Sequence, residues 1–231
     1  MASGLMFMLG LIDKYTSAYK FWKDIYILAA AINISNEVIA GAVLIACIVL
    51  LSFLNYPKKT LVDNFDFAAG ELHTNSFDSL KNEFHQNRGV FSSKPTDIVA
   101  KHTQAYSVEL IYGTKEPLAE GAWVSYCTKI QGISLLKYTL GNYYLQFEAS
   151  SSDVNCFFLE GKPEDGVKNE VKINISDNRL ISYPLRKLFP FTYLINNKIT
   201  ATYEICFVIS DLTCCTNKGS IIISHLYFAK K

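Results

Sequence analysis

The sequence predicts a mainly-β domain that follows an N-terminal transmembrane helix. Two observations predict this fold class. Residues 37–56 are apolar and long enough to cross a bilayer as a helix, and hydrophobic and polar residues alternate in short runs from residue 105 onward. A chain of 231 residues has room for one such helix and one domain of ordinary size.

The predicted membrane helix reads EVIAGAVLIACIVLLSFLNY, and none of its residues from 38 to 54 carries a charge. A helix needs roughly 17–25 apolar residues to span the hydrocarbon core. Pro57, Lys58 and Lys59 end the segment, and a buried helix of a soluble protein is the alternative. The small residues suited to close helix packing are Gly41, Ala42 and Ala46. We therefore expect the lipid bilayer and other membrane-protein subunits as partners.

Residues 1–36 are expected to form a helix that precedes the membrane segment. Apolar residues recur there every three or four positions, at Ile12, Tyr15, Tyr19, Trp22, Tyr26 and Ala29. This stripe indicates either an interfacial helix in the membrane plane or a helix that packs on a partner. Three lysines precede the membrane segment and two follow it, which slightly favours the non-cytoplasmic side for the C-terminal domain.

Residues 57–104 are expected to hold a short helix and a linker, and residues 105–231 the β-rich globular domain. Phe77, Leu80 and Phe84 have helical spacing within residues 76–84. The expected strands are 107–112, 123–136, 143–149, 154–159, 171–175, 199–211 and 220–229, with a short helix at 179–189. Antiparallel strands with one polar face predict a small barrel, and a β-sandwich is the alternative.

The cysteines indicate packing rather than a metal site. Cys127, Cys156 and Cys206 lie in apolar or alternating runs, where we expect core packing or a single bridge such as Cys156–Cys206. No second ligand lies at zinc-site spacing, so no metal is expected. Cys214 and Cys215 are neighbours in a polar turn and are the candidate redox residues.

The other polar residues give no catalytic set. Glu160, Glu164 and Asp165 form an acidic stretch that suits a solvated loop better than a calcium site, because the ligand spacing of a calcium loop is lacking. Strand alternation places His225 on the side of Ile223 and Tyr227, which predicts a core histidine. The chain has no phosphate loop, nucleophile elbow or HExxH motif, so neither a catalytic residue nor a cofactor is predicted.

The C-terminal half resembles the oligonucleotide/oligosaccharide-binding (OB) fold. The resemblance is carried by WVSYCTKIQG from residue 123, YLQF from residue 144, VNCFF from residue 154 and the hairpin of residues 199–229. It implies a small closed Greek-key barrel. It also implies a basic and aromatic ligand surface, formed here by Lys129, Lys137, Tyr138, Tyr143 and Tyr144. Core or protein contacts are the alternative for these tyrosines.

These observations predict a single-pass membrane protein whose β-rich domain is a structural or interaction subunit of a larger assembly. One alternative is a membrane-tethered module that binds a lipid, a glycan or single-stranded nucleic acid. Another is a thiol-dependent enzyme that uses Cys214 or Cys215. The formal net charge of +1 argues against nucleic acid, since phosphate binding requires a basic surface.

Overall fold

The computed structural model describes residues 57–73, 75–93, 99–113, 120–175, 180–211 and 218–230, together with Gly41 and Leu44. The chain divides into two compact units, Met1–Tyr56 and Pro57–Lys231. The predicted membrane segment and the helix expected before it lie outside the described residues, apart from Gly41 and Leu44. In the described part of the chain, no helix is long and apolar enough to cross a membrane.

The second unit contains two antiparallel sheets. Sheet A consists, in spatial order, of β11 (Leu180–Pro184), β8 (Tyr144–Ser150), β13 (Gly219–Ala229), β6 (Ser107–Tyr112), β5 (Val99–Gln104) and β2 (Glu71–His73), with β1 (Lys59–Asp63) also paired to β13. Sheet B consists of β10 (Asn169–Asn174), β9 (Cys156–Pro163), β12 (Thr202–Ser210), β7 (Trp123–Gln131), β4 (Arg88–Ser92) and β3 (Ser76–Phe77). The helices are α4 (Gly132–Leu140), α5 (Leu185–Leu188) and α6 (Phe191–Asn196).

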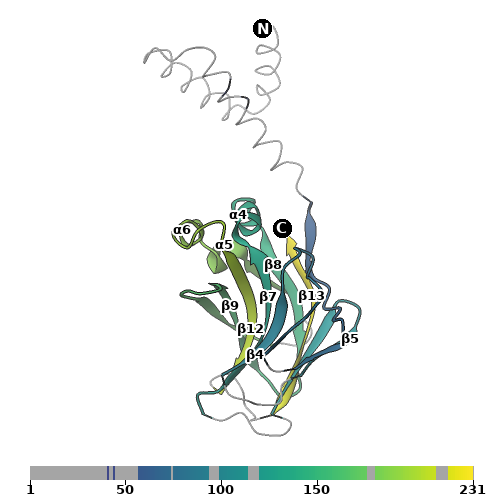
Figure 1. Cartoon of the computed structure of the whole chain (residues 1–231). Helices are drawn as coiled ribbons and strands as arrows, with labels where there is room; N and C mark the ends of the chain where they lie inside the picture. Colours follow the sequence, from purple (N-terminus) through teal and green to yellow (C-terminus); the bar gives the residue numbers. More distant parts are fainter. Residues whose placement is uncertain are drawn as a thin grey trace. The chain divides into compact units, whose positions relative to one another are not determined.

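The two sheets face each other as a β-sandwich, with the hydrophobic core between them (Figure 1). Aromatic rings from both sheets meet in this core. The ring of Phe147 on β8 lies 5.1 Å from that of Phe207 on β12 and 6.1 Å from that of Phe157 on β9. The burial pattern of β8 alternates along the whole strand, as expected for a strand with one face in the core.

The predicted mainly-β domain is confirmed, but the closed OB-like barrel is wrong. Among the described strands, none pairs from one sheet to the other, so the sheets remain open, and the β-sandwich is the correct alternative. Alternation reports only that one face of each strand is buried, and both architectures satisfy that condition.

Three predicted elements differ from the structure. The predicted strand 123–136 ends at Gln131, where α4 begins. The predicted helix at 179–189 is β11 followed by the single turn of α5. The predicted helix at 76–84 is instead β3 and a turn, because the side chain of Asn82 accepts hydrogen bonds from the backbone N–H groups of Phe84 and Gln86 and donates to Thr128 Oγ1.

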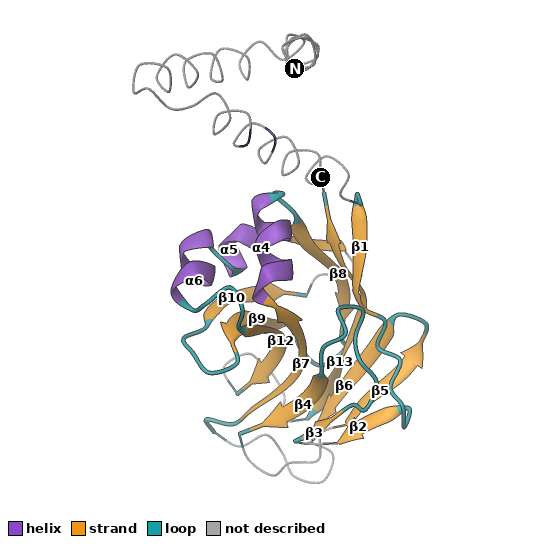
Figure 2. Cartoon of the chain, turned by 45° about the horizontal axis from the view of Figure 1, so that its top comes forward, coloured by secondary structure: helices purple, strands orange, loops and turns teal. Residues whose placement is uncertain are grey.

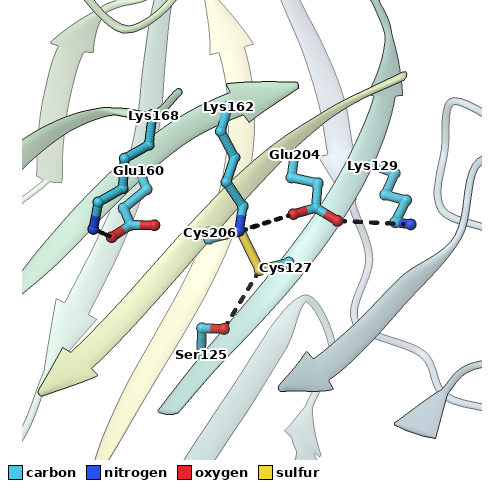
Figure 3. The surroundings of a disulfide bond; sticks show 8 residues. All are labelled: Ser125, Cys127, Lys129, Glu160, Lys162, Lys168, Glu204 and Cys206. Carbon is cyan, nitrogen blue, oxygen red and sulfur yellow. Dashed lines mark hydrogen bonds and ion pairs between the residues drawn. A yellow bond between two sulfur atoms is a disulfide. The ribbon is translucent and has the colours of Figure 1, made fainter. Parts of the chain in front are cut away.

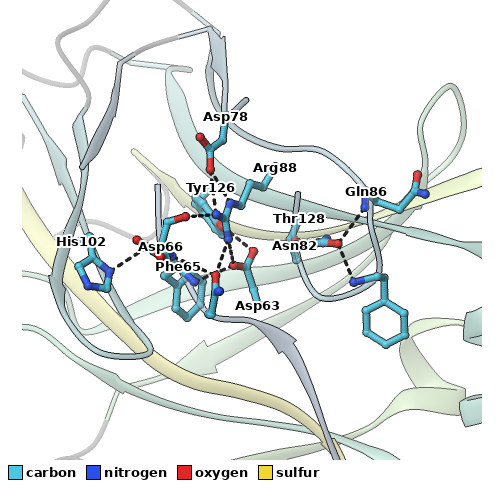
Figure 4. A network of polar contacts seen from close by, with 12 residues as sticks. Asp63, Phe65, Asp66, Asp78, Asn82, Gln86, Arg88, His102, Tyr126 and Thr128 are labelled. Carbon is cyan, nitrogen blue, oxygen red and sulfur yellow. Dashed lines mark hydrogen bonds and ion pairs between the residues drawn. The ribbon is translucent and has the colours of Figure 1, made fainter. Parts of the chain in front are cut away.

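A buried polar network fixes β1 and β4 to the core (Figure 4). The Arg88 guanidinium on β4 lies 2.6 Å from Asp63 Oδ1 and 2.8 Å from Asp78 Oδ2. The Tyr126 hydroxyl on β7 donates to Asp63 Oδ2 at 2.6 Å. Further oxygen partners of Arg88 are Asn64 Oδ1 and the backbone carbonyl of Asp66. The segment expected to be a linker is thus held in the sandwich by charge-assisted bonds.

Candidate functional site

The candidate site is the outer face of sheet B, opposite to the core. Cross-strand partners share a face, so the register defines this surface. Cys127 lies opposite Cys206, which lies opposite Glu160, and Lys129 lies opposite Glu204, which lies opposite Lys162. We call this surface the B face.

A disulfide between Cys127 and Cys206 lies in the middle of the B face (Figure 3). Its sulfur atoms are 2.12 Å apart, and it cross-links the adjacent strands β7 and β12. Both cysteines are buried, with Val208 beside them and the half-buried rings of Phe91 and Phe158 packed against them. The suggested pair Cys156–Cys206 is therefore wrong, because direct cross-strand register places Cys127 against Cys206.

Two exposed aromatic side chains lie on the same face as this disulfide. Phe77 on β3 is 53% exposed, and its ring meets that of Phe91 edge-on at 5.3 Å. Trp123, the first residue of β7, is 36% exposed and lies on the same face. Large apolar side chains that are exposed on one face of a sheet are typical of binding surfaces.

Gly89 allows the two phenylalanine rings to lie together. It lies opposite Cys127 on β4, and a Cβ atom there would be 2.7 Å from the Ser76 carbonyl oxygen and 3.2 Å from the Phe77 ring. Only glycine therefore permits this close approach of β3 to β4. Gly89 thus makes room on the B face for the rings of Phe77 and Phe91.

A row of charged residues crosses the B face beside the aromatic rings. Lys129 Nζ lies 2.6 Å from Glu164 Oε1. It also lies 3.6 Å from Glu204 Oε1 (Figure 3). Lys162 Nζ lies 3.4 Å from the other oxygen of Glu204. Lys129 and Glu204 are buried, and mutual pairing offsets the cost of removing their charges from water.

A second ion pair continues this row. Lys168 Nζ lies 2.5 Å from Glu160 Oε1 and 2.8 Å from Glu170 Oε2. Partial burial alone would lower the pKa of Lys168, but the hydrogen bonds to Glu160 and Glu170 outweigh it and raise its pKa. The lysine thus stays charged and paired at neutral pH.

The structure places some of the other predicted residues elsewhere. Glu160, expected in a solvated loop, is a buried residue of β9. Tyr138 and Tyr143 are buried and meet edge-on at 5.0 Å, so they do not extend a ligand surface from Lys129. Gly41 is helical, with no atom within 4 Å of an added Cβ. The remaining predicted helix-packing and redox residues, Ala42, Ala46, Cys214 and Cys215, lie outside the described residues.

His225 is not a core histidine. It has a φ of 56°, and the pairing of β13 with β8 shifts register between Ser224 and Tyr227. This bulge turns the ring of His225 toward the half-exposed outer side of sheet A, where Nδ1 lies 3.4 Å from Glu148 Oε2. The alternation argument fails because one extra residue reverses the face of every side chain after it.

The cysteines of the B face also lie near a carboxylate. The Sγ atoms of Cys127 and Cys206 and an oxygen of Glu204 lie within 4.8 Å of one another. The two sulfur atoms are bonded to each other, however, so they are not thiolates that ligate a metal. Sequence reasoning missed this cluster because its members come from strands about 80 residues apart. A paired register of residues 123–131 and 202–210 was the signal that could have found it.

Comparisons with known proteins give only distant structural similarity. No protein-family model matches the chain. No curated protein sequence matches it either. Among solved structures, the family 11 carbohydrate-binding module of the cellulosomal cellulase Lic26A-Cel5E of Clostridium thermocellum has a TM-score of 0.47 and 12% identity, covering 77% of this chain and 97% of that chain. The family 30 carbohydrate-binding module of the cellulosomal cellulase Cel9D-Cel44B of Clostridium thermocellum has a TM-score of 0.40 and 12% identity, covering 76% and 95%. Similarity at this level assigns no function.

Proposed function

We propose that the second unit is a non-catalytic ligand-binding module, and that its B face binds a neutral oligosaccharide. The observation that carries this proposal is the exposed ring of Phe77, which lies 5.2 Å from Lys129 Nζ in a fixed row of paired lysines and glutamates. Trp123 is a second exposed ring farther along the same face. This combination is the usual composition of a binding site, in which apolar surface gives affinity and a few placed polar groups give orientation.

A sugar ring matches both parts of the B face. Its C–H groups carry a slight positive charge and pack on the negative face of an aromatic ring. Its hydroxyl groups both donate and accept hydrogen bonds, so they can pair with carboxylate oxygens such as those of Glu204 and with ammonium groups such as that of Lys162. Because the ion pairs already hold these side chains in place, little side-chain entropy is lost on binding.

The charges of the B face favour a neutral ligand over an acidic one. Each of Lys129, Lys162 and Lys168 lies within 3.4 Å of a glutamate oxygen. An anionic group would have to displace a glutamate from its lysine, whereas a hydroxyl group can bond at the edge of the pair. The predicted interaction subunit depends on residues 1–56, but this binding function depends only on described residues.

A binding assay with matched variants tests the proposal. The purified full chain is screened on immobilised neutral and acidic oligosaccharides, and the best ligand is measured by calorimetry. Phe77→Ala and Trp123→Ala should each weaken binding by roughly 3- to 10-fold, as expected for one lost aromatic contact. Tyr106→Ala is the matched control, because Tyr106 is an exposed aromatic residue that belongs to the β5–β6 turn of sheet A. Binding that is lost in the control but kept in both B-face variants would overturn the proposal, as would preference for acidic sugars.

We also propose that the module lies on the non-cytoplasmic side of the membrane. The Cys127–Cys206 disulfide supports this placement, because disulfides persist in oxidising compartments. Labelling of Cys214 and Cys215 with an impermeant maleimide should occur from the outer side of intact cells. Labelling only after permeabilisation would contradict this topology.

A further inference from the structure

The three helices gather at one end of the sandwich (Figures 1 and 2). α4 follows β7 directly, and it contacts both α5 and α6. Their inner sides are buried, with Leu135 and Leu194 packed inward. We call this end, formed by α4, α5, α6 and the turns beside them, the helical end.

The helical end exposes large apolar side chains in regular positions. Ile133 and Leu140 are seven residues apart on α4, and Phe191 and Ile195 are four residues apart on α6, so each pair shares one side of its helix. All four side chains are between 46% and 50% exposed. These four side chains lie on two neighbouring helices, so they form one apolar surface.

All charged side chains within residues 132–142 and 180–200, which form the three helices and their adjoining residues, are basic. The basic residues there are Lys137, Arg186, Lys187 and Lys198, and all four are exposed. Neither residues 132–142 nor residues 180–200 contain an aspartate or a glutamate. Since the whole chain carries a net charge of only +1, positive charge is concentrated on these three helices and their adjoining residues.

The first and the last residues of the second unit both lie at the helical end. The Tyr143 hydroxyl, just after α4, donates to the Pro57 carbonyl oxygen at 2.7 Å. The backbone N–H of Lys230 donates to the Lys58 carbonyl oxygen at 2.9 Å, which adds two more exposed lysines. In the sequence, Pro57 follows directly on the segment that we predict to span a membrane.

We propose that the helical end is a membrane-docking surface that binds an anionic lipid bilayer. Apolar side chains at this spacing enter the boundary between headgroups and acyl chains, and the surrounding lysines and arginine bind the anionic headgroups. The long aliphatic stems of these cations extend the apolar contact while their charges stay in water. A second copy of this chain fits less well, because a symmetric contact would bring the positive charges of two helical ends together.

Depth-dependent quenching tests this proposal in the intact chain. Cys47, Cys214 and Cys215 are replaced by serine and the buried free thiol Cys156 by alanine, and one introduced cysteine at position 140 or 191 carries an environment-sensitive fluorophore. The protein is placed in nanodiscs that contain spin-labelled phosphatidylcholine, with or without anionic phosphatidylglycerol. Leu140→Cys and Phe191→Cys should show blue-shifted emission and strong quenching in anionic discs, and weaker quenching in neutral discs or high salt.

Ser152→Cys is the matched control. Ser152 is exposed and lies two residues beyond the end of β8, whereas the first residue of β8, Tyr144, pairs with Ala229 at the helical end. A probe at position 152 should therefore remain unquenched in the same discs. The double change Arg186→Gln and Lys187→Gln should reduce the ratio of docked to undocked molecules by roughly fivefold per cation.

Two results would overturn the proposal. Equal quenching at positions 140, 191 and 152 would show that the helical end has no preferred contact with lipid. Shielding of positions 140 and 191 that depends on protein concentration, or that persists in neutral discs at high salt, would show that a second copy or residues 1–56 cover this surface instead.

Discussion

Arg88 is a fully buried cation with two aspartates beside it, and its removal leaves both of them without a countercharge. Burial alone would lower its pKa, but the charge of Asp63 and the hydrogen bonds with Asp78 and Asp63 outweigh this effect and raise the pKa. We predict that Arg88→Met lowers the free energy of unfolding by about 3–5 kcal/mol, as for other broken buried ion pairs. Denaturant titration followed by circular dichroism measures this loss.

The matched control for this change is Arg186→Met. Arg186 is exposed on α5, so the same substitution should change the free energy of unfolding by less than about 0.5 kcal/mol. A comparable loss in both variants would show that the network around Arg88 adds little to stability.

Tyr126, in the same network, makes the stability of the folded chain depend on pH. Complete burial, followed by the charge of Asp63, raises the pKa of the Tyr126 hydroxyl well above its usual value. Above pH about 10 the unfolded chain loses this proton while the folded chain keeps it, so stability falls as pH rises. We predict that Tyr126→Phe makes this alkaline decline shallower, by up to about 1.4 kcal/mol per pH unit. Unfolding curves at pH 8 to 11 measure the slope, and an unchanged slope in Tyr126→Phe would refute the assignment.

At the scale of elements, the junction between β7 and α4 depends on Gly132. Its N–H donates to the Ala201 carbonyl oxygen at 2.9 Å, and an added Cβ would lie 2.5 Å from the Ile199 carbonyl oxygen and 2.6 Å from the Tyr203 ring. We predict that Gly132→Ala costs about 1–3 kcal/mol, because the backbone near Ile199 must move. Thermal unfolding compares it with Ser134→Ala in the same helix, where a favourable helix propensity should leave stability nearly unchanged.

The disulfide joins the two central strands of sheet B. It closes a loop between positions 79 residues apart, so reduction should destabilise the unit by about 2–4 kcal/mol. We predict this loss for the double variant Cys127→Ser and Cys206→Ser, measured by denaturant titration with and without a dithiol. Since β7 and β12 stay paired over nine positions, the variant should still fold. If dithiol also destabilises the double variant to the same extent, the effect comes from other cysteines.

The elements also show what the sequence can predict. Strands such as β8 and β12 were predictable because their alternation or length is strong in the sequence. The end of β7 was not, since Gly132, Ile133 and Ser134 are as compatible with a strand as with the start of α4, and only contacts with residues 199–203 decide. The B face could not be predicted for the same reason. Its rings and charges lie on six strands, and the pairing register between strands far apart in the sequence cannot be read from a local pattern.

At the scale of the whole molecule, the B face and the helical end belong to one compact unit, and the same strands connect them. β7 and β12 run through the B face, and β7 leads into α4 at the helical end. If the helical end rests on a bilayer as proposed, Trp123 lies at the end of β7 that points away from the lipid, and Lys129 lies nearer to it. A ligand on the B face would then lie along the side of the module, and not at the end of the module that is farthest from the membrane.

A single-molecule pulling experiment tests which contacts of this unit resist force. β1 pairs with the last residues of β13, from Lys59 with Ala229 to Asp63 with Leu226. We predict that Arg88→Met lowers the rupture force when the chain is pulled from residue 57 against an anchored B face, measured by single-molecule force spectroscopy. Pulling from residue 230 is the control, because β13 is held by strands on both of its sides. An equal drop in both directions would mean general destabilisation.

The pairing of β1 with β13 has a mechanical consequence for a tethered binding protein. Tension from a tether before Pro57 would enter along the axis of β1, and the ladder bonds to β13 are perpendicular to that axis. Force along the strand therefore loads all of these hydrogen bonds together in shear, and they do not break one after another. At the last pair of this ladder, Asp63 accepts hydrogen bonds from Arg88 and Tyr126, which belong to sheet B. Asp63 and its neighbours would thus carry part of the force on a captured ligand from one sheet to the other.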